Sequence, residues 1–410
     1  MAKLSAFRAL RPRPADAAAI AAVPYDVVTT EEARQQAVGN PLSFLRVSRA
    51  ELEFPPGTNP FSDDIYDRAV HNFENLKRQS LVLENEPSLY FYCLRTGEHQ
   101  QTGLAGCFSL DDYDRDVIKK HERTRRDKED DRTRHMVALG AQTGPVFLAY
   151  RQAPDVDDIA AHVASGEPLF DFEAADGVRH TVWRVTGGLR DALVSAVSNV
   201  QALYIADGHH RAASAARARH DIGNRGITRS SLGDEADYTT LLGVAFPANQ
   251  VQILPYNRVV RDLGRLDPDS FLSAVRDRFE MRDGSGTPSM RGEIAMYFNG
   301  HWRLLRPRNH SNHGDTIASL DVSILQHDLL QPVLGIGDIR TDKRIDFVGG
   351  RRGTTELERL VHNGEAAVAF SLYPVSVTDL MAASDAGTIM PPKSTWFEPK
   401  LRDGLLIHLI

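Results

Sequence analysis

The stretch that most constrains this fold is residues 201–219, which read QALYIADGHHRAASAARAR. The apolar run at 202–206 is typical of a buried strand. Asp207-Gly208 is typical of a turn, and the alanine-rich sequence from Arg211 onward favours a helix. The sequence therefore predicts a strand, a tight turn and a helix, with polar side chains gathered in the turn.

The residue types in this turn indicate anion binding. The first backbone N–H groups of a helix and its dipole attract negative charge, and Gly208 would let a ligand approach the backbone. His209, His210 and Arg211 are suitable donors to phosphate oxygens, while Asp207 could hold a metal or orient a histidine. Alternatively, Asp207 only caps the helix and the histidines are surface residues. The crowding of five polar residues favours the functional interpretation.

Composition limits the class of protein. A length of 410 residues suits two or three domains. The net charge of −7 disfavours non-specific nucleic-acid binding. Cys93 and Cys107 form neither a metal-type pair nor a disulfide framework, which suits a reducing compartment. With no signal peptide or membrane-spanning run in view, we expect a cytoplasmic protein with no membrane or nucleic-acid partner. A homodimer is left open.

The order of predicted elements is that of an α/β (α+β) protein. We divide it into a mixed α/β segment at 1–110, a core at 111–260 and a C-terminal α/β segment at 261–410. Near the N-terminus, Thr30 is predicted to cap a helix and residues 43–48 to form a strand. Asn299-Gly300 predicts a type I′ hairpin. The segment 111–135 is highly charged and predicts a solvated helix.

Four further groups could serve a site, each beside a plainer interpretation. His121-Glu122 stands out within the charged segment, and the nearby arginines are either phosphate ligands or a solvated face. Tyr25-Asp26 could face a site or form a local turn. Asn257-Arg258 is either a site element or a turn with a surface arginine. In the tail MPPKSTWFEPK, Lys393 and Lys400 could contact phosphate, or the tail is a docking strand. His310 and His313 are an unpromising metal pair without further ligands.

The motifs ADGHHR, KHERT and MPPKSTWFEPK together resemble a bacterial and archaeal family of unknown function, ParB/SpoOJ-related (domain of unknown function 1015). The resemblance covers nearly the whole chain and implies a ParB/sulfiredoxin-like nucleotide-binding core. The nearest functional match is the free serine kinases, whose glutamate acts on the serine hydroxyl and whose DGHHR turn handles nucleotide phosphates and magnesium.

Residue by residue, the resemblance implies catalytic roles for Glu122, His121 and Asp207, and metal binding by Asp207 and His209. The cofactor-binding set would be Gly208, His209, His210, Arg211 and Lys393. Glu122 and Asp207 are separated by 85 positions (207 − 122 = 85), so tertiary folding must bring them together across a cleft.

The sequence therefore predicts a phosphotransferase that uses Mg and a nucleotide (ATP, ADP or CTP) and acts on a small hydroxyl metabolite such as free serine. The alternatives are a nucleotide hydrolase acting as a switch and a non-catalytic protein that senses a ligand or binds a partner. The acidic balance argues against the helix-turn-helix module of ParB proteins proper.

Overall fold

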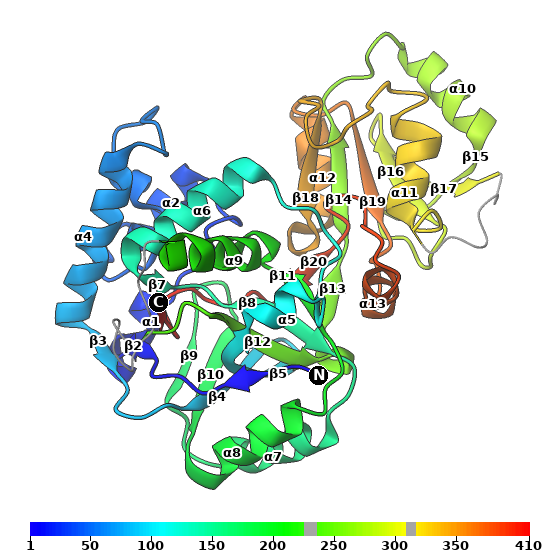
Figure 1. The fold of residues 1–410 in the computed structure, drawn as a ribbon. Helices are drawn as coiled ribbons and strands as arrows, with labels where there is room; N and C mark the ends of the chain where they lie inside the picture. Colours follow the sequence, from blue (N-terminus) through cyan, green and yellow to red (C-terminus); the bar gives the residue numbers. More distant parts are fainter. Residues whose placement is uncertain (225–235, 309–316) are drawn as a thin grey trace. The chain divides into compact units, whose positions relative to one another are not determined.

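The computed structural model describes residues 1–224, 236–308 and 317–410, which fold into two compact units. Unit 1 contains residues 1–120, 124–251 and 399–410, and unit 2 contains residues 121–123 and 252–398 (Figure 1). The predicted segments 1–110 and 111–260 are thus not separate bodies, because strands from both pair in one sheet. The predicted C-terminal segment at 261–410 contains most of unit 2, but its last residues, 399–410, belong to unit 1.

Unit 1 is built on a mixed sheet that has nine strands within the described residues. Its order is β6-β11-β8-β12-β5-β4-β10-β9, with β1 paired to β5. The pairs β6/β11 and β8/β12 are parallel, and the other pairs are antiparallel. The strands are β1 (Leu4–Ser5), β4 (Leu89–Thr96), β5 (His99–Ser109), β6 (Ile118–Lys119), β8 (Val146–Tyr150), β9 (Phe170–Glu173), β10 (Arg179–Val185), β11 (Leu203–Asp207) and β12 (Thr240–Pro247).

Helices cover both faces of this sheet. Helices α6 (Arg126–Leu139) and α9 (His209–Asn224) lie on one face, and α7 (Pro154–Ala164) and α8 (Gly187–Val197) lie on the other (Figure 1). Alanine side chains let α9 pack closely, and five of them are buried: Ala212, Ala213, Ala215, Ala216 and Ala218. The short helix α5 (Leu110–Asp114) follows β5.

The N-terminal part of unit 1 forms a second apolar cluster against α6. It contains α1 (Ala17–Ile20), α2 (Thr30–Ala37), α3 (Leu45–Ser48), α4 (Asp63–Gln79) and the strand pair β2 (Leu10–Pro12) and β3 (Leu81–Leu83). The cap of α2 is Thr29 and not Thr30, because Thr29 Oγ1 accepts from Glu32 N in a capping box. The predicted strand at 43–48 is wrong, since Leu45 and Val47 are buried within a single helical turn.

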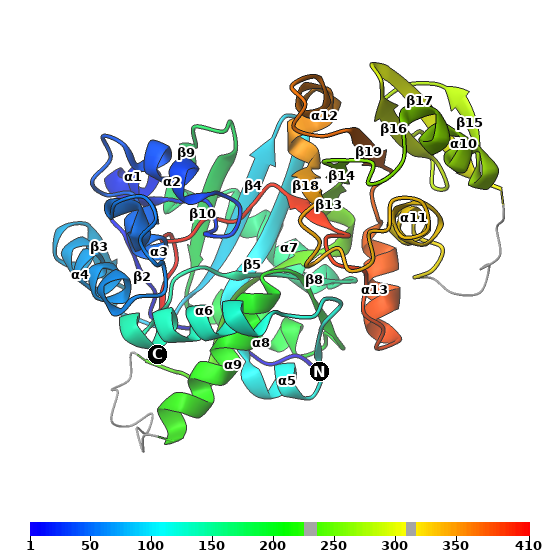
Figure 2. The same ribbon diagram turned by 90° about the horizontal axis from the view of Figure 1, so that it is seen from above.

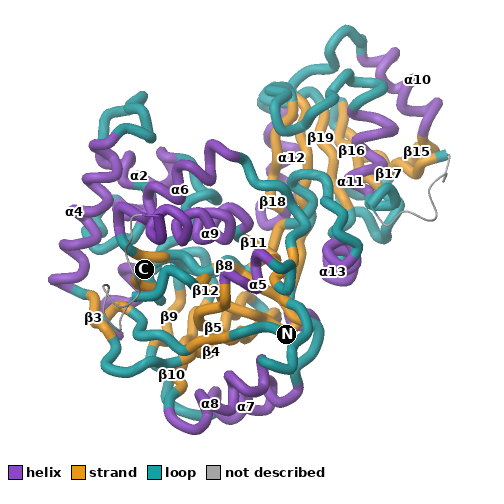
Figure 3. The backbone as a smooth tube through the Cα atoms, in the orientation of Figure 1, coloured by secondary structure: helices purple, strands orange, loops and turns teal. Residues whose placement is uncertain are grey.

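Unit 2 is built on a six-stranded sheet of order β15-β17-β16-β19-β14-β18 within the described residues. The strands are β14 (Tyr256–Val260), β15 (Phe279–Asp283), β16 (Ile294–Phe298), β17 (His301–Pro307), β18 (Ile345–Gly349) and β19 (Val368–Leu372), and Figure 3 shows them in orange. The helices are α10 (Pro268–Arg278), α11 (Asp321–Leu325), α12 (Gly353–His362) and α13 (Val377–Asp385) (Figure 2).

Neighbouring residues of β16 explain how two helices pack on unit 2. Tyr297 joins the cluster under α12 through Leu357, whereas Phe298 contacts Phe271 of α10 with ring centroids 5.0 Å apart. Successive strand residues point to opposite faces, so α12 and α10 cover opposite faces of the sheet. The predicted hairpin is confirmed, with φ of 49° at Asn299 and 78° at Gly300.

Two other predictions in this part of the chain have different outcomes. Asn257 and Arg258 do not form a turn with a surface arginine, because both lie in β14 and are only 2% and 1% exposed. His310 and His313 lie outside the described residues. Among the described residues, no helix is long and apolar enough to cross a membrane.

The chain ends by returning to unit 1. After β20 (Trp396–Glu398) pairs with β13 (Gln252–Leu254) in unit 2, residues 399–410 cross unit 1 and β21 (His408–Leu409) pairs with β7 (Ala141–Gln142). On the way, Asp403 exchanges backbone hydrogen bonds with Ala22, and Gly404 N donates to Thr143 O at 3.0 Å. This segment therefore brings C-terminal side chains beside residues from the start and middle of the chain.

Candidate functional site

The predicted strand, turn and helix are confirmed around Gly208. Strand β11 ends at Asp207, α9 begins at His209, and Ala212 N donates to Gly208 O at 3.0 Å. The φ of Gly208 is +95°, a conformation that residues with a Cβ rarely adopt. A Cβ at this position would also lie 3.1 Å from Arg211 Nε. Glycine is therefore required by the turn and by the guanidinium packed against it.

Asp207 is held in its ionised form by cations of unit 1. Its Oδ1 accepts from Gly208 N at 2.9 Å, and its Oδ2 lies 3.0 Å from Lys400 Nζ and 3.9 Å from Arg211 Nη2. Burial by itself would raise the pKa of Asp207, but the charges of Lys400 and Arg211 outweigh it and hold that pKa well below its usual range. The lysine placed at the turn is thus Lys400 of the returning segment.

His210 fixes the position of the residues that follow Glu122. Its Nε2 accepts from the backbone N–H of Arg125 at 3.1 Å, so the neutral ring carries its proton on Nδ1. Glu122 is three residues earlier, and chain connectivity keeps its Cα within roughly 11 Å of the Arg125 Cα. Residues 121–123 are grouped with unit 2, where His121 O accepts from Met390 N at 2.8 Å. A cleft between Glu122 and the turn stays a prediction.

Arg211 points into the interior of unit 1. It is 8% exposed, and its Nη1 donates to Pro145 O at 2.5 Å. Burial would lower its pKa, but the carboxylates of Asp26, Asp207 and Asp403 raise it, so the guanidinium is charged. Its Nε has no hydrogen-bond partner among the described residues. Phosphate binding by the Arg211 side chain stays a prediction, whereas the packing of its guanidinium against Gly208 is observed.

The Arg211 side chain lines a cavity of about 40 Å³ inside unit 1. The lining residues come from six parts of the chain: Tyr25, Ser48, Arg132, His135, Met136, Ala141, Gln142, Thr143, Gly144, Arg211, Leu241 and Asp403. Besides Arg211 Nε, Ser48 Oγ and Asp403 Oδ1 are buried without a hydrogen-bond partner in the described parts of the chain. Buried polar atoms are normally paired, so these three atoms, none of which is accessible to solvent, are exceptions close to the cavity.

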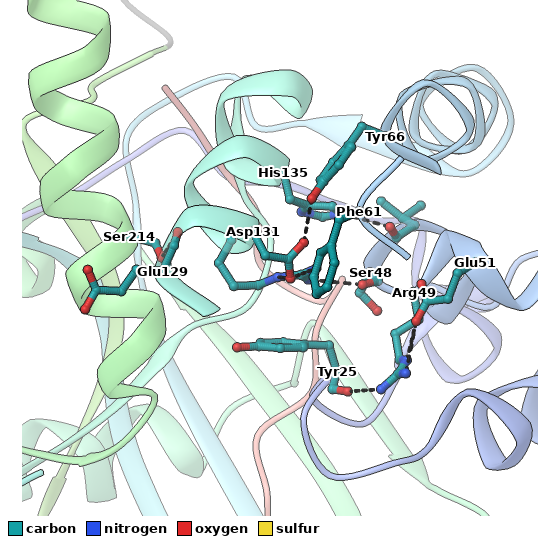
Figure 4. Close-up of polar contacts among 12 residues, drawn as sticks. Tyr25, Ser48, Arg49, Glu51, Phe61, Tyr66, Glu129, Asp131, His135 and Ser214 are labelled. Carbon is teal, nitrogen blue, oxygen red and sulfur yellow. Dashed lines mark hydrogen bonds and ion pairs between the residues drawn. The ribbon is translucent and has the colours of Figure 1, made fainter. Parts of the chain in front are cut away.

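One wall of this cavity is a rigid polar network (Figure 4). The Arg132 guanidinium lies 4.2 Å from the centroid of the Tyr25 ring and donates to Asp131 Oδ2 and Ser48 O. Asp131 Oδ1 in turn accepts from Tyr66 Oη at 2.7 Å. Helices α3, α4 and α6 supply Ser48, Tyr66 and the Asp131-Arg132 pair, and their hydrogen bonds hold the arginine over the ring of Tyr25, which lies in the loop between α1 and α2.

His135, on the same wall, is neutral. Its Nε2 lies 2.9 Å from Val47 O, an atom that can only accept, so Nε2 carries the proton. Burial, helped by the positive charge of Arg132, lowers the pKa of His135 to about 4. This imidazole therefore positions α6 against α3 and carries no charge near pH 7.

Asp403 is the titratable group of the cavity. It is 3% exposed, and a Cβ at Gly144 would lie 2.2 Å from its Oδ1. Burial and the carboxylate of Asp26 raise its pKa to about 7, against the opposing charges of Arg211, Arg132 and Arg402. The absence of a side chain at Gly144 thus lets the Asp403 carboxyl group pack directly against the backbone.

Lys393 lies in unit 2, while the turn lies in unit 1. Its φ is +58°, its Nζ is 5.5 Å from the Tyr256 ring centroid, and its carbonyl accepts from Arg258 Nη2 at 3.0 Å. Burial lowers the pKa of Arg258 to about 10. Cofactor binding by Lys393 stays a prediction.

Sequence reasoning noticed Tyr25 but missed Arg132, His135 and Asp403 as members of the site. Arg132 and His135 stand in a charged segment whose pattern favours a solvated helix, and Asp403 follows an arginine in a short polar stretch. The one local signal was Gly404, whose φ is +85° and where a Cβ would lie 2.6 Å from Phe44. That signal marks a tight turn and does not reveal the neighbours of Asp403.

The chain matches the family described as "Protein of unknown function (DUF1015)" over residues 4–323. It belongs to this family. No curated protein shows significant sequence similarity to it.

Several solved structures are similar to the chain. A free serine kinase in complex with AMP is 13% identical and aligns over 77% of this chain and 95% of that one, with a TM-score of 0.37. A conserved hypothetical protein from Pyrococcus furiosus is 14% identical over 74% and 95%, with a TM-score of 0.36. SbnI with a C-terminal truncation, from Staphylococcus aureus, is 12% identical over 74% and 87%, with a TM-score of 0.38.

Proposed function

We propose that this protein binds a nucleotide together with Mg²⁺ and transfers a phosphoryl group to a small hydroxyl-bearing metabolite such as free serine. The observation that carries the proposal is the turn between β11 and α9. Gly208 opens the backbone there at the start of a 16-residue helix, with two histidines in its first turn. Helix N-termini of this kind bind phosphate groups. A ParB/sulfiredoxin-like core, as the sequence motifs imply, is part of this proposal.

The Asp207 carboxylate fits a magnesium ion, and the His209 ring does not. Mg²⁺ prefers oxygen ligands and usually takes one or two carboxylates together with phosphate oxygens and water. Gly208 N–H and the Lys400 ammonium use two of the roughly four acceptor positions of Asp207. A bound Mg²⁺ would neutralise charge on the phosphates. His209 would instead act as a hydrogen-bond donor to phosphate.

Glu122 is proposed as the base. Its carboxylate would take the proton of the acceptor hydroxyl while the hydroxyl oxygen forms a bond to the transferred phosphorus. The bond from that phosphorus to the bridging oxygen of the nucleotide breaks, and the shortened nucleotide leaves with the electron pair. Such reactions depend on positioning and charge neutralisation more than on covalent help from the protein. The contact between His210 and Arg125 supports this role, because it holds the segment after Glu122 beside the turn.

The proposal is tested by measuring phosphate transfer with the purified full-length chain. ATP, ADP and CTP are each supplied with Mg²⁺ and with L-serine or another hydroxyl acceptor, and the phosphorylated product is quantified. Glu122→Gln should lower turnover by roughly 10²–10⁴ and leave nucleotide affinity nearly unchanged. Glu86→Gln is the matched control, since this carboxylate forms a half-exposed ion pair with Arg184 and such pairs contribute little.

Other outcomes separate the alternatives. Phosphate release without any acceptor would favour a hydrolase that acts as a switch. Nucleotide or metabolite binding without turnover would favour a sensor or partner-binding protein. A Glu122→Gln variant that turns over at the wild-type rate would remove the proposed base.

A further inference from the structure

We infer that β15 is an interaction surface at which two copies of this chain pair edge to edge, antiparallel, around a two-fold axis at Met281. The unit 2 sheets of the two copies would then join into one continuous sheet. This inference is independent of the proposed function, because no residue of β15 belongs to the proposed site. Its basis is the pattern of backbone hydrogen bonds and side-chain charges on this strand.

Strand β15 lies at one edge of the unit 2 sheet, and within the described residues it pairs only with β17 (Figure 1). Just before the strand, Arg278 O accepts from Arg308 N at 2.9 Å, and just after it Gly284 N donates to a carbonyl of β17 at 3.3 Å. Because hydrogen-bonded pairs alternate along an antiparallel ladder, the even-numbered residues of β15 direct their backbone groups toward β17. The backbone N–H and C=O groups of Met281 and Asp283 therefore point out of the sheet, where no described residue bonds to them.

The opposite edge of the same sheet, β18, is blocked by a side chain. Arg261 N donates to Arg344 O at 2.8 Å just before β18, so by the same alternation the odd-numbered residues of β18 point outward. The outward N–H of Phe347 donates to Asp346 Oδ1 at 2.8 Å, and this contact occupies a group to which another strand would bond. Proteins commonly protect exposed strand edges in such ways. The unprotected edge at β15 is therefore the one that is available to a partner strand.

The charges of β15 are complementary to those of a second copy of the same strand. In an antiparallel pair around Met281, Glu280 of each copy faces Arg282 of the other, so symmetry makes the contact twice. Glu280 is exposed and has no ion-pair partner among the described residues. The Arg282 side chain is 57% exposed, although it also contacts Glu293.

These charges also select one register of the pair. Opposite charges directly across two strands are stabilising, whereas like charges there are destabilising. A two-fold axis at Glu280 would place that carboxylate against its own copy, and an axis at Arg282 would do the same with the guanidinium. Only the register centred on Met281 between them brings unlike charges together, which favours a second copy of this chain as the partner.

The other face of β15 adds an apolar contact. Phe279 is buried, whereas Met281 is only partly buried at the edge of the sheet. The two Met281 side chains would meet at the two-fold axis, and the unbranched methionine side chain adapts readily to such a contact. A strand of five residues buries little surface, so we expect a reversible dimer with a dissociation constant of about 1 µM or above.

Sedimentation velocity of the full-length chain tests this inference. Between about 1 µM and about 200 µM, the range in which weak interfaces form, the wild-type chain should change from monomer to dimer. Met281→Pro removes the outward N–H but no hydrogen bond to β17, a position at which edge strands tolerate proline, and should abolish the dimer. A wild-type chain that stays monomeric throughout would overturn the inference and leave this edge to a strand of a different protein.

Charge reversals test the register. Glu280→Arg and Arg282→Glu each place like charges opposite one another and should raise the dissociation constant at least about tenfold. An equimolar mixture of the two variants restores both unlike pairs and should form a heterodimer with wild-type affinity. Asp158→Arg is the matched control, because it makes the same change of charge at an exposed position of α7 in unit 1. A dimer that Glu280→Arg leaves unchanged, or a mixture that stays monomeric, would contradict this interface.

Hydrogen exchange at two protein concentrations locates the contact in the chain. Peptides that cover residues 279–283 should exchange more slowly at about 200 µM than at about 2 µM, because pairing protects the outward amides of Met281 and Asp283. Peptides that cover residues 345–349 of β18 should exchange equally at both concentrations. Dimerisation without added protection at 279–283 would place the contact between copies elsewhere and overturn the inference.

Discussion

Replacing Asp403 by asparagine should stabilise the protein at neutral and alkaline pH. The carboxyl is buried and its pKa rises from 3.8 to about 7 in the folded state. A raised carboxyl pKa means that the folded protein favours the protonated form, so ionisation opposes folding. This destabilising contribution to the free energy of unfolding is absent well below pH 4, grows as pH rises from about 4 to about 7, and is constant at higher pH. Because asparagine cannot ionise, the Asp403→Asn variant does not lose this stability at high pH.

The size of the effect follows from the shift. A difference of about 3 pKa units at about 1.4 kcal/mol per unit gives a ceiling of about 4 kcal/mol at pH 8. Half of that ceiling would raise the melting temperature of a unit of this size by roughly 4–8 °C. The charged groups that set the balance are Arg211, Arg132, Arg402 and Asp26, and asparagine leaves all of them in place.

Differential scanning fluorimetry of both proteins between pH 4 and pH 8.5 measures this prediction. The melting temperature of Asp403→Asn should equal that of the wild type at pH 4 and exceed it progressively up to about pH 7. Asp158→Asn, which changes an exposed carboxylate of α7, should show no such divergence. A variant that is less stable at pH 8, or whose difference from the wild type does not change with pH, would show that folding does not raise the pKa of Asp403.

The remaining predictions concern the turn and its ligands. Lys400→Met removes the cation 3.0 Å from Asp207 and should lower the free energy of unfolding by about 1–3 kcal/mol, as measured by urea denaturation. A nucleotide with Mg²⁺ at one hundred times its dissociation constant should stabilise the protein by about 2.7 kcal/mol, and no thermal shift with ATP, ADP or CTP would contradict nucleotide binding.

Local sequence was sufficient to predict the turn at Asp207-Gly208, on which the candidate site is built. An apolar run followed by Asp-Gly and an alanine-rich segment leaves few alternatives to strand, turn and helix, because each choice depends on neighbouring residues. The hairpin at Asn299-Gly300 was predictable for the same reason. Where local signals were ambiguous, as at residues 43–48 and at Arg258, burial in the folded protein decided the outcome.

The cavity could only be found in the tertiary structure. Its walls join Tyr25, Ser48, Arg132, Arg211 and Asp403, which are separated by up to 378 positions in the chain (403 − 25 = 378). The returning C-terminal segment creates this contact through backbone hydrogen bonds to Ala22 and Thr143, and such pairings leave no periodic signature in sequence. The charge of a side chain is encoded in the sequence, but its desolvation and its neighbours depend on the fold. For that reason an ordinary aspartate near the C-terminus becomes, once folded, a carboxyl group with a pKa of about 7.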